Sequence, residues 1–212
     1  FDVKFRLWKE TENLPSVAIG IRDIAGTGTF AAEYLVASKF IDIDSYFGDF
    51  NYLSRVDLTL GLGWGDMSNN KFSNPLTKIS DEFSQRTLIQ NTKGGEFSPG
   101  RYFSGPMGIF AGIEVPLPNL HGLRLKLEYD ATDYTEEGFP FGRESFPFAF
   151  KNVKQSQSRI NAGFTLPIND YVQIYGAVTK GNTISFGFSL QGGFGPKDPI
   201  IKKNDPYEPI RN

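Results

Sequence analysis

Apolar and charged residues alternate strictly along residues 123–130. The odd positions, Leu123, Leu125, Leu127 and Tyr129, are apolar or aromatic, and every even position is charged. Successive side chains of a β-strand point to opposite faces of the sheet. The stretch therefore predicts a strand with one apolar face and one charged face.

Similar alternation recurs along the rest of the chain. It predicts nine strands, over residues 1–9, 16–24, 29–40, 54–65, 106–117, 123–130, 157–167, 171–179 and 183–194. No stretch has the period of a helix. Each predicted strand is close to the ~9–11 residues that cross a bilayer when the strand is tilted. So many alternating strands are unusual for a soluble β-protein and favour a sheet with one face in lipid.

The connections between the predicted strands differ in length and support the same interpretation. Residues 66–104 and 132–156 are long and polar, whereas residues 118–122 and 168–170 make short connections. Outer-membrane barrels of bacteria have long external loops and short periplasmic turns. A sheet in lipid must also close on itself, because lipid offers its edges no hydrogen bonds. We therefore expect the two long loops at the cell surface.

The predicted fold class is all-β, an antiparallel transmembrane β-barrel of the outer-membrane type. Bacterial single-chain barrels have even strand numbers, so nine strands would be part of a barrel of about twelve. Residues 1–194 are predicted to be this barrel segment, with strands missing before Phe1. Residues 195–212, rich in proline and charge, are predicted to be a periplasmic linker.

Composition excludes several classes of protein. The net charge of −2 gives no electrostatic basis for binding nucleic acid. The absence of cysteine excludes disulfides and thiolate metal sites. No run of residues approaches 18 apolar positions, so the sequence contains no membrane-spanning helix.

The charged faces of the predicted strands carry the candidate contacts for a polar solute. They are Lys4, Arg6, Arg22, Arg55, Asp57, Glu114, Arg124, Lys126, Glu128, Asp130 and Arg159. The alternation also assigns Glu33 and Lys39 to this face. Buried unpaired charge is costly, so these groups must pair across strands or lie in water. Three interpretations stay open: a structural lattice of ion pairs, a hydrated path or binding surface for a polar solute, and one face of a soluble sandwich.

Signals of enzymatic chemistry are weak. His121 is the one histidine and falls in a tight turn, and no Gly-x-Ser-x-Gly motif occurs. Glu128 and Asp130 have the spacing of a glycosidase pair along one strand face, but the neighbouring Arg124 and Lys126 favour ion pairing. The sequence predicts no enzyme, no cofactor and no metal site.

Aromatic residues add two further expectations. Trp64, Tyr129, Tyr134 and Tyr175 fall near strand ends and are typical of an aromatic girdle at the lipid interface. The Phe-Pro-Phe repeats within residues 139–150 either pack on the barrel mouth or stack on sugar rings.

Several stretches resemble a known family in order and spacing. They are residues 14–30 with Glu33-Tyr-Leu-Val-Ala-Ser-Lys39, Leu58-Thr-Leu-Gly-Leu-Gly-Trp-Gly65, Gly122-Leu-Arg-Leu-Lys-Leu-Glu-Tyr-Asp130 and Lys180-Gly-Asn-Thr-Ile-Ser-Phe-Gly187. They resemble the YjbH-like (GfcD-like) exopolysaccharide biosynthesis proteins of Gram-negative outer membranes. In that family further strands precede the matching segment, and a second large region follows the linker.

The resemblance implies localisation in the bacterial outer membrane and a role in the export or assembly of an extracellular polysaccharide. It implies outer-membrane lipids, the polysaccharide, and lipoprotein and periplasmic proteins as partners, and it implies no catalytic residues. Three other functions remain open on the residues alone. The chain would be a structural barrel that anchors a secretion complex, an outer-membrane enzyme, or a soluble carbohydrate-binding β-sandwich.

Overall fold

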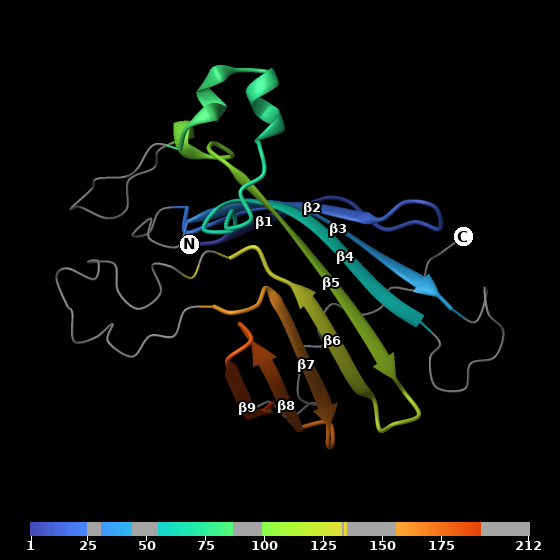
Figure 1. Ribbon diagram of the computed structural model, residues 1–212. Coiled ribbons are helices and arrows are strands. Elements are labelled where there is room, and N and C mark those ends of the chain that lie inside the picture. Colours follow the sequence, from blue (N-terminus) through green and yellow to red (C-terminus); the bar gives the residue numbers. More distant parts are fainter. Residues whose placement is uncertain (25–30, 44–54, 87–98, 133, 135–155, 192–212) are drawn as a thin grey trace, which may run out of the picture.

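The computed structural model describes residues 1–24, 31–43, 55–86, 99–132, 134 and 156–191. Nine antiparallel strands form one sheet in chain order (Figure 1). They are β1 (Val3–Trp8), β2 (Ser16–Arg22), β3 (Ala32–Asp42), β4 (Arg55–Gly65), β5 (Met107–Leu117), β6 (Leu123–Tyr129), β7 (Ile160–Pro167), β8 (Val172–Thr179) and β9 (Thr183–Leu190). The predicted all-β class, the antiparallel pairing and the number of strands are confirmed in the described residues.

The sheet curves strongly but is open (Figure 1). Within the described residues, β1 and β9 are its two edges and do not pair with each other. Closure into a barrel is therefore not part of the observed architecture. The predicted linker and the Phe-Pro-Phe repeats lie outside the described residues. In the described part of the chain, no helix is long and apolar enough to cross a membrane.

The strand register divides the side chains between two faces, because directly opposite residues of an antiparallel pair share a face. One row crosses the sheet through Leu58, Ile113, Leu127, Ala162, Val178 and Ile184. The adjacent row runs through Asp57, Glu114, Lys126, Gly163, Ala177 and Ser185. We call the face of the first row the apolar face and that of the second the polar face.

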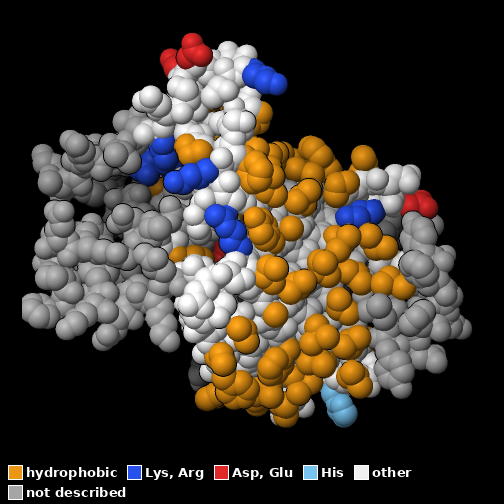
Figure 2. Space-filling view, viewed as in Figure 1, with side chains coloured by type: hydrophobic (Ala, Val, Ile, Leu, Met, Phe, Trp, Pro, Cys, Tyr) orange, Lys and Arg blue, Asp and Glu red, His pale blue; other side chains and the backbone are white. Residues whose placement is uncertain are grey.

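The apolar face is exposed to its surroundings. Ile184 of β9 is 82% exposed, and Leu127 in the middle of the sheet is still 47% exposed. Figure 2 shows apolar side chains spread over the convex side of the sheet. By contrast, Asp130 and Asn161 on the polar side of the sheet are buried. Large contiguous apolar surfaces on proteins mark contacts with other proteins or with a membrane.

Two short turns use left-handed backbone. Lys180 and Gly181 have φ values of 58° and 71° and join β8 to β9, which is the pattern of a type I′ hairpin turn. His121 and Gly122, with φ values of 56° and 74°, end the turn between β5 and β6. The expected exposed turn position of His121 is observed.

The described part of the connection between β4 and β5 contains regular structure that the sequence did not predict. It contains the 3-10 helices η1 (Pro75–Lys78), η2 (Asp81–Ser84) and η3 (Pro99–Arg101). The side chain of Asn74 accepts a hydrogen bond from the N–H of Leu76 and so caps η1. The sequence predicted no helix, and these 3-10 segments of three or four residues are too short to show a helical period.

Gly61 provides a position for aromatic packing across strands. An added Cβ at Gly61 would lie 2.0 Å from the ring of Phe110, its partner on β5. We expect Gly61→Ala to lower the free energy of unfolding by about 1–3 kcal/mol, since the ring must move. Gly112→Ala is the matched control, because its Cβ would meet no atom closer than 3.9 Å. Equal effects of the two variants in denaturant titrations would contradict this packing.

Candidate functional site

The polar face brings the predicted solute contacts together. The strand register places on this face Lys4, Arg6, Arg22, Arg55, Asp57, Glu114, Arg124, Lys126 and Glu128. Asp130 and Arg159 continue the β6–β7 ladder at its end, where the Asp130 N–H donates to the Arg159 carbonyl at 2.8 Å. The charges thus form one surface that extends across most of the sheet.

Glu33 and Lys39 do not belong to that surface, which corrects the sequence assignment. Glu33 pairs with Trp64 and Lys39 with Leu58, both on the apolar face. β3 carries large side chains with apolar surface on both of its faces, for example Leu35 on one face and Tyr34 on the other. Because the alternation in β3 is weak, the positions of Glu33 and Lys39 in the sequence did not identify the polar face of this strand.

The cations of β6 have ion-pair partners on β5. Arg124 Nη1 lies 3.3 Å from one oxygen of Glu114, and Lys126 Nζ lies 3.0 Å from the other. Asp57 is directly opposite Glu114, and its buried Oδ1 has no hydrogen-bond partner among the described residues. Two carboxylates opposite each other repel, so the two cations offset local negative charge. This arrangement favours a structural role for Arg124 and Lys126.

Asp130 lies just beyond the end of β6 and is almost fully buried. It accepts hydrogen bonds from the Thr132 N–H at 2.8 Å, the Tyr134 hydroxyl, and the Asn161 amide at 3.3 Å. Burial alone would raise the pKa of Asp130, but these hydrogen bonds outweigh it and hold the pKa below its usual value. Lys180 lies 4.1 Å above the Tyr134 ring and adds a cation–π contact.

The lowered pKa of Asp130 predicts a pH-dependent contribution to stability. The contribution is fully present above the unfolded pKa of about 3.9 and is lost as the pH falls towards the lower folded pKa. We expect Asp130→Asn to lower the free energy of unfolding by about 1.5–3 kcal/mol at neutral pH. On acidification, the variant should lose less stability than the wild type. Urea titrations at neutral and acidic pH test this. Equal losses in acid for the wild type and the variant would contradict it.

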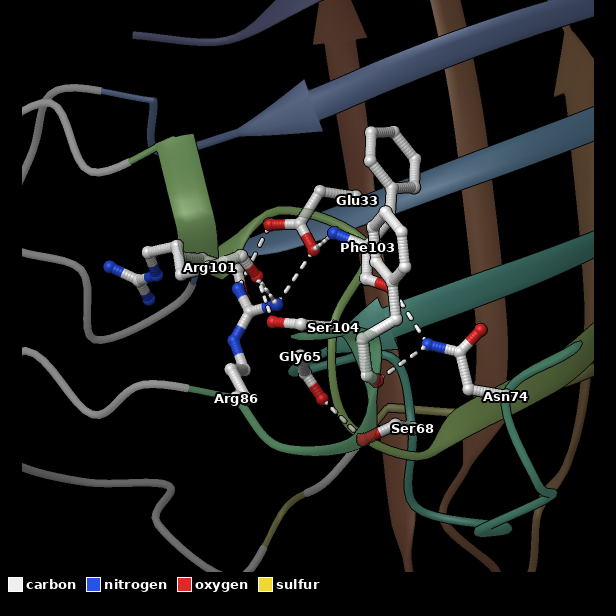
Figure 3. Close-up of polar contacts among 10 residues, drawn as sticks. Glu33, Gly65, Ser68, Asn74, Arg86, Arg101, Phe103 and Ser104 are labelled. Atoms are coloured by element: carbon white, nitrogen blue, oxygen red, sulfur yellow. Dashed lines mark hydrogen bonds and ion pairs between the residues drawn. The ribbon is translucent and has the colours of Figure 1, made fainter. Parts of the chain in front are cut away.

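The long connection is fastened to the sheet by a buried ion pair (Figure 3). Both terminal nitrogens of the Arg86 guanidinium donate to the Glu33 carboxylate, at 2.7 and 2.9 Å, and Glu33 is fully buried. The Phe103 N–H donates to the same carboxylate at 3.0 Å. Arg86 also donates to the carbonyls of Ala31 and Arg101. The buried negative charge of Glu33 is tolerated because both carboxylate oxygens accept hydrogen bonds.

Further hydrogen bonds hold the connection above the strand ends. The Asn74 amide donates to the carbonyls of Phe103 and Phe83, at 2.7 and 3.2 Å. The Asn70 side chain donates to the Ile109 carbonyl and accepts from the Ile109 N–H. Burial lowers the pKa of the neighbouring Arg101 guanidinium, and the nearby Arg86 cation lowers it further. The described part of the connection is therefore a fixed rim at one end of β3–β5.

The predicted aromatic girdle is retained only at Tyr129, which is 38% exposed on the apolar face. Trp64 is buried and packs edge-to-face on Phe103. Tyr134 donates to Asp130 instead of facing outward. Tyr175 shares the polar face with Thr165, its partner on β7. Strand-end position alone did not reveal which face each ring occupies.

The comparisons with known proteins show the family. The family model described as "Exopolysaccharide biosynthesis protein YbjH" matches residues 1–212. The chain belongs to this exopolysaccharide biosynthesis family. It is 36% identical over 205 residues to the "Uncharacterized lipoprotein YjbH" of Escherichia coli strain K12. That match covers 96% of this chain and 26% of the relative, so the chain spans about a quarter of the relative's length. No solved structure matches it.

Proposed function

We propose that this chain is part of an outer-membrane β-barrel that serves exopolysaccharide secretion, with the polar face as the lumen or docking site for the polymer. One observation carries the proposal: the sheet exposes its apolar face and gathers most of its charges on the opposite face. In water this distribution is unfavourable, whereas in lipid it is the expected one. The partners would be outer-membrane lipids, the polysaccharide, and lipoprotein or periplasmic proteins of the same system.

The open edges of the sheet fit a barrel completed by other strands. Unpaired strand edges do not occur in the hydrocarbon region of a membrane, because each free backbone group would cost several kcal/mol. We propose that strands elsewhere in the same longer polypeptide pair with β1 and β9 and bring the total to about twelve. The share of the E. coli relative that this chain spans leaves room for them. The name of that relative, a lipoprotein, supports a place in the cell envelope.

A second candidate function is a structural barrel that anchors a secretion complex without conducting polymer. It is favoured by Glu114, which binds both Arg124 and Lys126 and so leaves these cations less able to hold a solute. Neither candidate assigns a catalytic role to the chain.

Deletion and complementation of the full-length protein test the proposal. We expect the protein to sediment with outer membranes, to show heat-modifiable mobility on gels, and to be required for polymer in the medium. Loss of polymer with full-length protein found only in the soluble fraction would refute the barrel. Unchanged secreted polymer after deletion would refute the role in secretion.

A further inference from the structure

Three cations of the polar face stand apart from those of β6. Among the described residues, Lys4, Arg6 and Arg22 have no ion-pair or hydrogen-bond partner for their side chains. Lys4 and Arg6 are exposed, and Arg22 is half-buried. Uncompensated cations on a protein surface retain their attraction for anions, whereas paired cations do not. These three cations therefore place free positive charge on the part of the polar face formed by β1 and β2, where Asp2 is a neighbouring carboxylate.

An aromatic ring lies within this group of cations. Lys4, Gly20 and Tyr34 form one row across β1, β2 and β3. A Cβ on Gly20 would lie 2.2 Å from Cζ of Tyr34, so the phenol ring crosses β2 over the glycine. The ring consequently extends from β3 towards the side chain of Lys4. The Tyr34 ring can lie over β2 because Gly20 has no side chain.

The strand geometry spaces the three cations as a diagonal series. Arg6 follows Lys4 by two residues, a step of about 6.6 Å along a strand. Arg22 lies on β2, two residues after Gly20, which is the residue opposite Lys4. It is therefore the diagonal neighbour of Lys4, about 7–8 Å away, on the side of Lys4 that faces away from Arg6. The series thus offers several positive charges in line beside one flat ring. An extended ligand with repeated negative charges and rings matches this arrangement better than a compact ion does.

We propose that Lys4, Arg6, Arg22 and Tyr34 form a binding subsite for an acidic polysaccharide, with the cations on its carboxylates and the ring against a sugar face. The inference rests on the proposed function and specifies its substrate class as a polyanionic sugar chain. Guanidinium and ammonium groups bind carboxylates at such exposed sites in a salt-dependent way. A neutral polymer would gain little from the three charges.

The test measures binding of oligomers of polygalacturonic acid to the full-length protein in detergent micelles. Neutral dextran oligomers of similar length and polyglutamate serve as comparison ligands. We expect Lys4→Gln with Arg6→Gln to weaken polygalacturonate binding roughly tenfold at low salt, and added salt to weaken wild-type binding similarly. The control, Lys71→Gln with Lys78→Gln, removes two exposed cations away from the polar face and should leave binding unchanged.

Tyr34→Leu separates ring stacking from charge. It should weaken polygalacturonate binding while leaving the weaker binding of polyglutamate unchanged. Equal wild-type affinity for dextran and polygalacturonate would overturn the proposal, as would equal losses in the test and control pairs. Loss of heat-modifiable mobility in the Lys4 and Arg6 variant would overturn it too, since the cations would then pair with a neighbouring strand. Secretion that needs the protein but no polygalacturonate binding would retain the proposed function and reject the acidic substrate.

Discussion

Replacing Glu33 with glutamine is expected to lower the free energy of unfolding by about 3–5 kcal/mol, the usual cost of breaking a buried ion pair from one side. The substitution leaves the Arg86 guanidinium, only 15% exposed, without a countercharge. It also weakens the hydrogen bond from the Phe103 N–H. The rim formed by the long connection should therefore loosen first. Urea titration of the folded protein in detergent micelles measures the loss.

The Lys39–Glu10 pair provides a control. Its atoms are 3.4 Å apart, and Lys39 is 27% exposed. Glutamine at position 10 keeps the oxygen that accepts from the Phe40 N–H, so Glu10→Gln should cost at most about 1 kcal/mol. A loss for Glu33→Gln no larger than that for Glu10→Gln would show that the buried pair does not fasten the connection.

Leu125→Arg should lower the free energy of unfolding in a membrane by about 2–4 kcal/mol if the site is near the bilayer midplane. Leu125 lies on the apolar face between Val115 and Phe164 and is 43% exposed. In water, a substitution at such an exposed position would change stability by only a few tenths of a kcal/mol. In lipid, the guanidinium must leave water, which explains the larger cost. Folding into vesicles of defined lipid at graded urea concentrations measures it.

Gln173→Arg is the matched control for this substitution. Gln173 lies on the polar face between Pro167 and Ser189, where an added guanidinium stays hydrated in the proposed lumen. We expect this variant to fold into vesicles as well as the wild type. A Leu125→Arg variant that folds equally well would refute contact between the apolar face and lipid.

Alternation predicted most of the strands because one face of each carries its apolar residues. Leu123 to Tyr129 alternate without exception, and the structure gives them one strand with the predicted faces. In β3 the rule failed, since Tyr34 and Leu35 are both large and fall on opposite faces. The face of β3 follows from its pairing with β4, which is a long-range feature that a single strand does not contain.

The rim was missed for a different physical reason. Arg86 reaches Glu33 across 53 positions in the chain, and no local pattern records such a contact. A local signal did exist for η1, because Asn74 followed by Pro75 is a typical capped start of a helical turn. Similarly, the sequence placed Arg124, Lys126 and Glu114 on one face but did not align them. Only the register showed that Lys126 faces Glu114.

Contact of the apolar face with lipid is tested most directly by measuring which successive residues of β6 are accessible from the bilayer and which from water. Residues 1–212 contain no cysteine, so a spin label on one introduced cysteine reports a single position in this segment. Labels at Leu125 and Leu127 should collide with oxygen dissolved in the bilayer. Labels at Lys126 and Glu128 should collide with a water-soluble nickel chelate. Equal access of the chelate to all four positions in membrane-reconstituted full-length protein would contradict the proposed barrel.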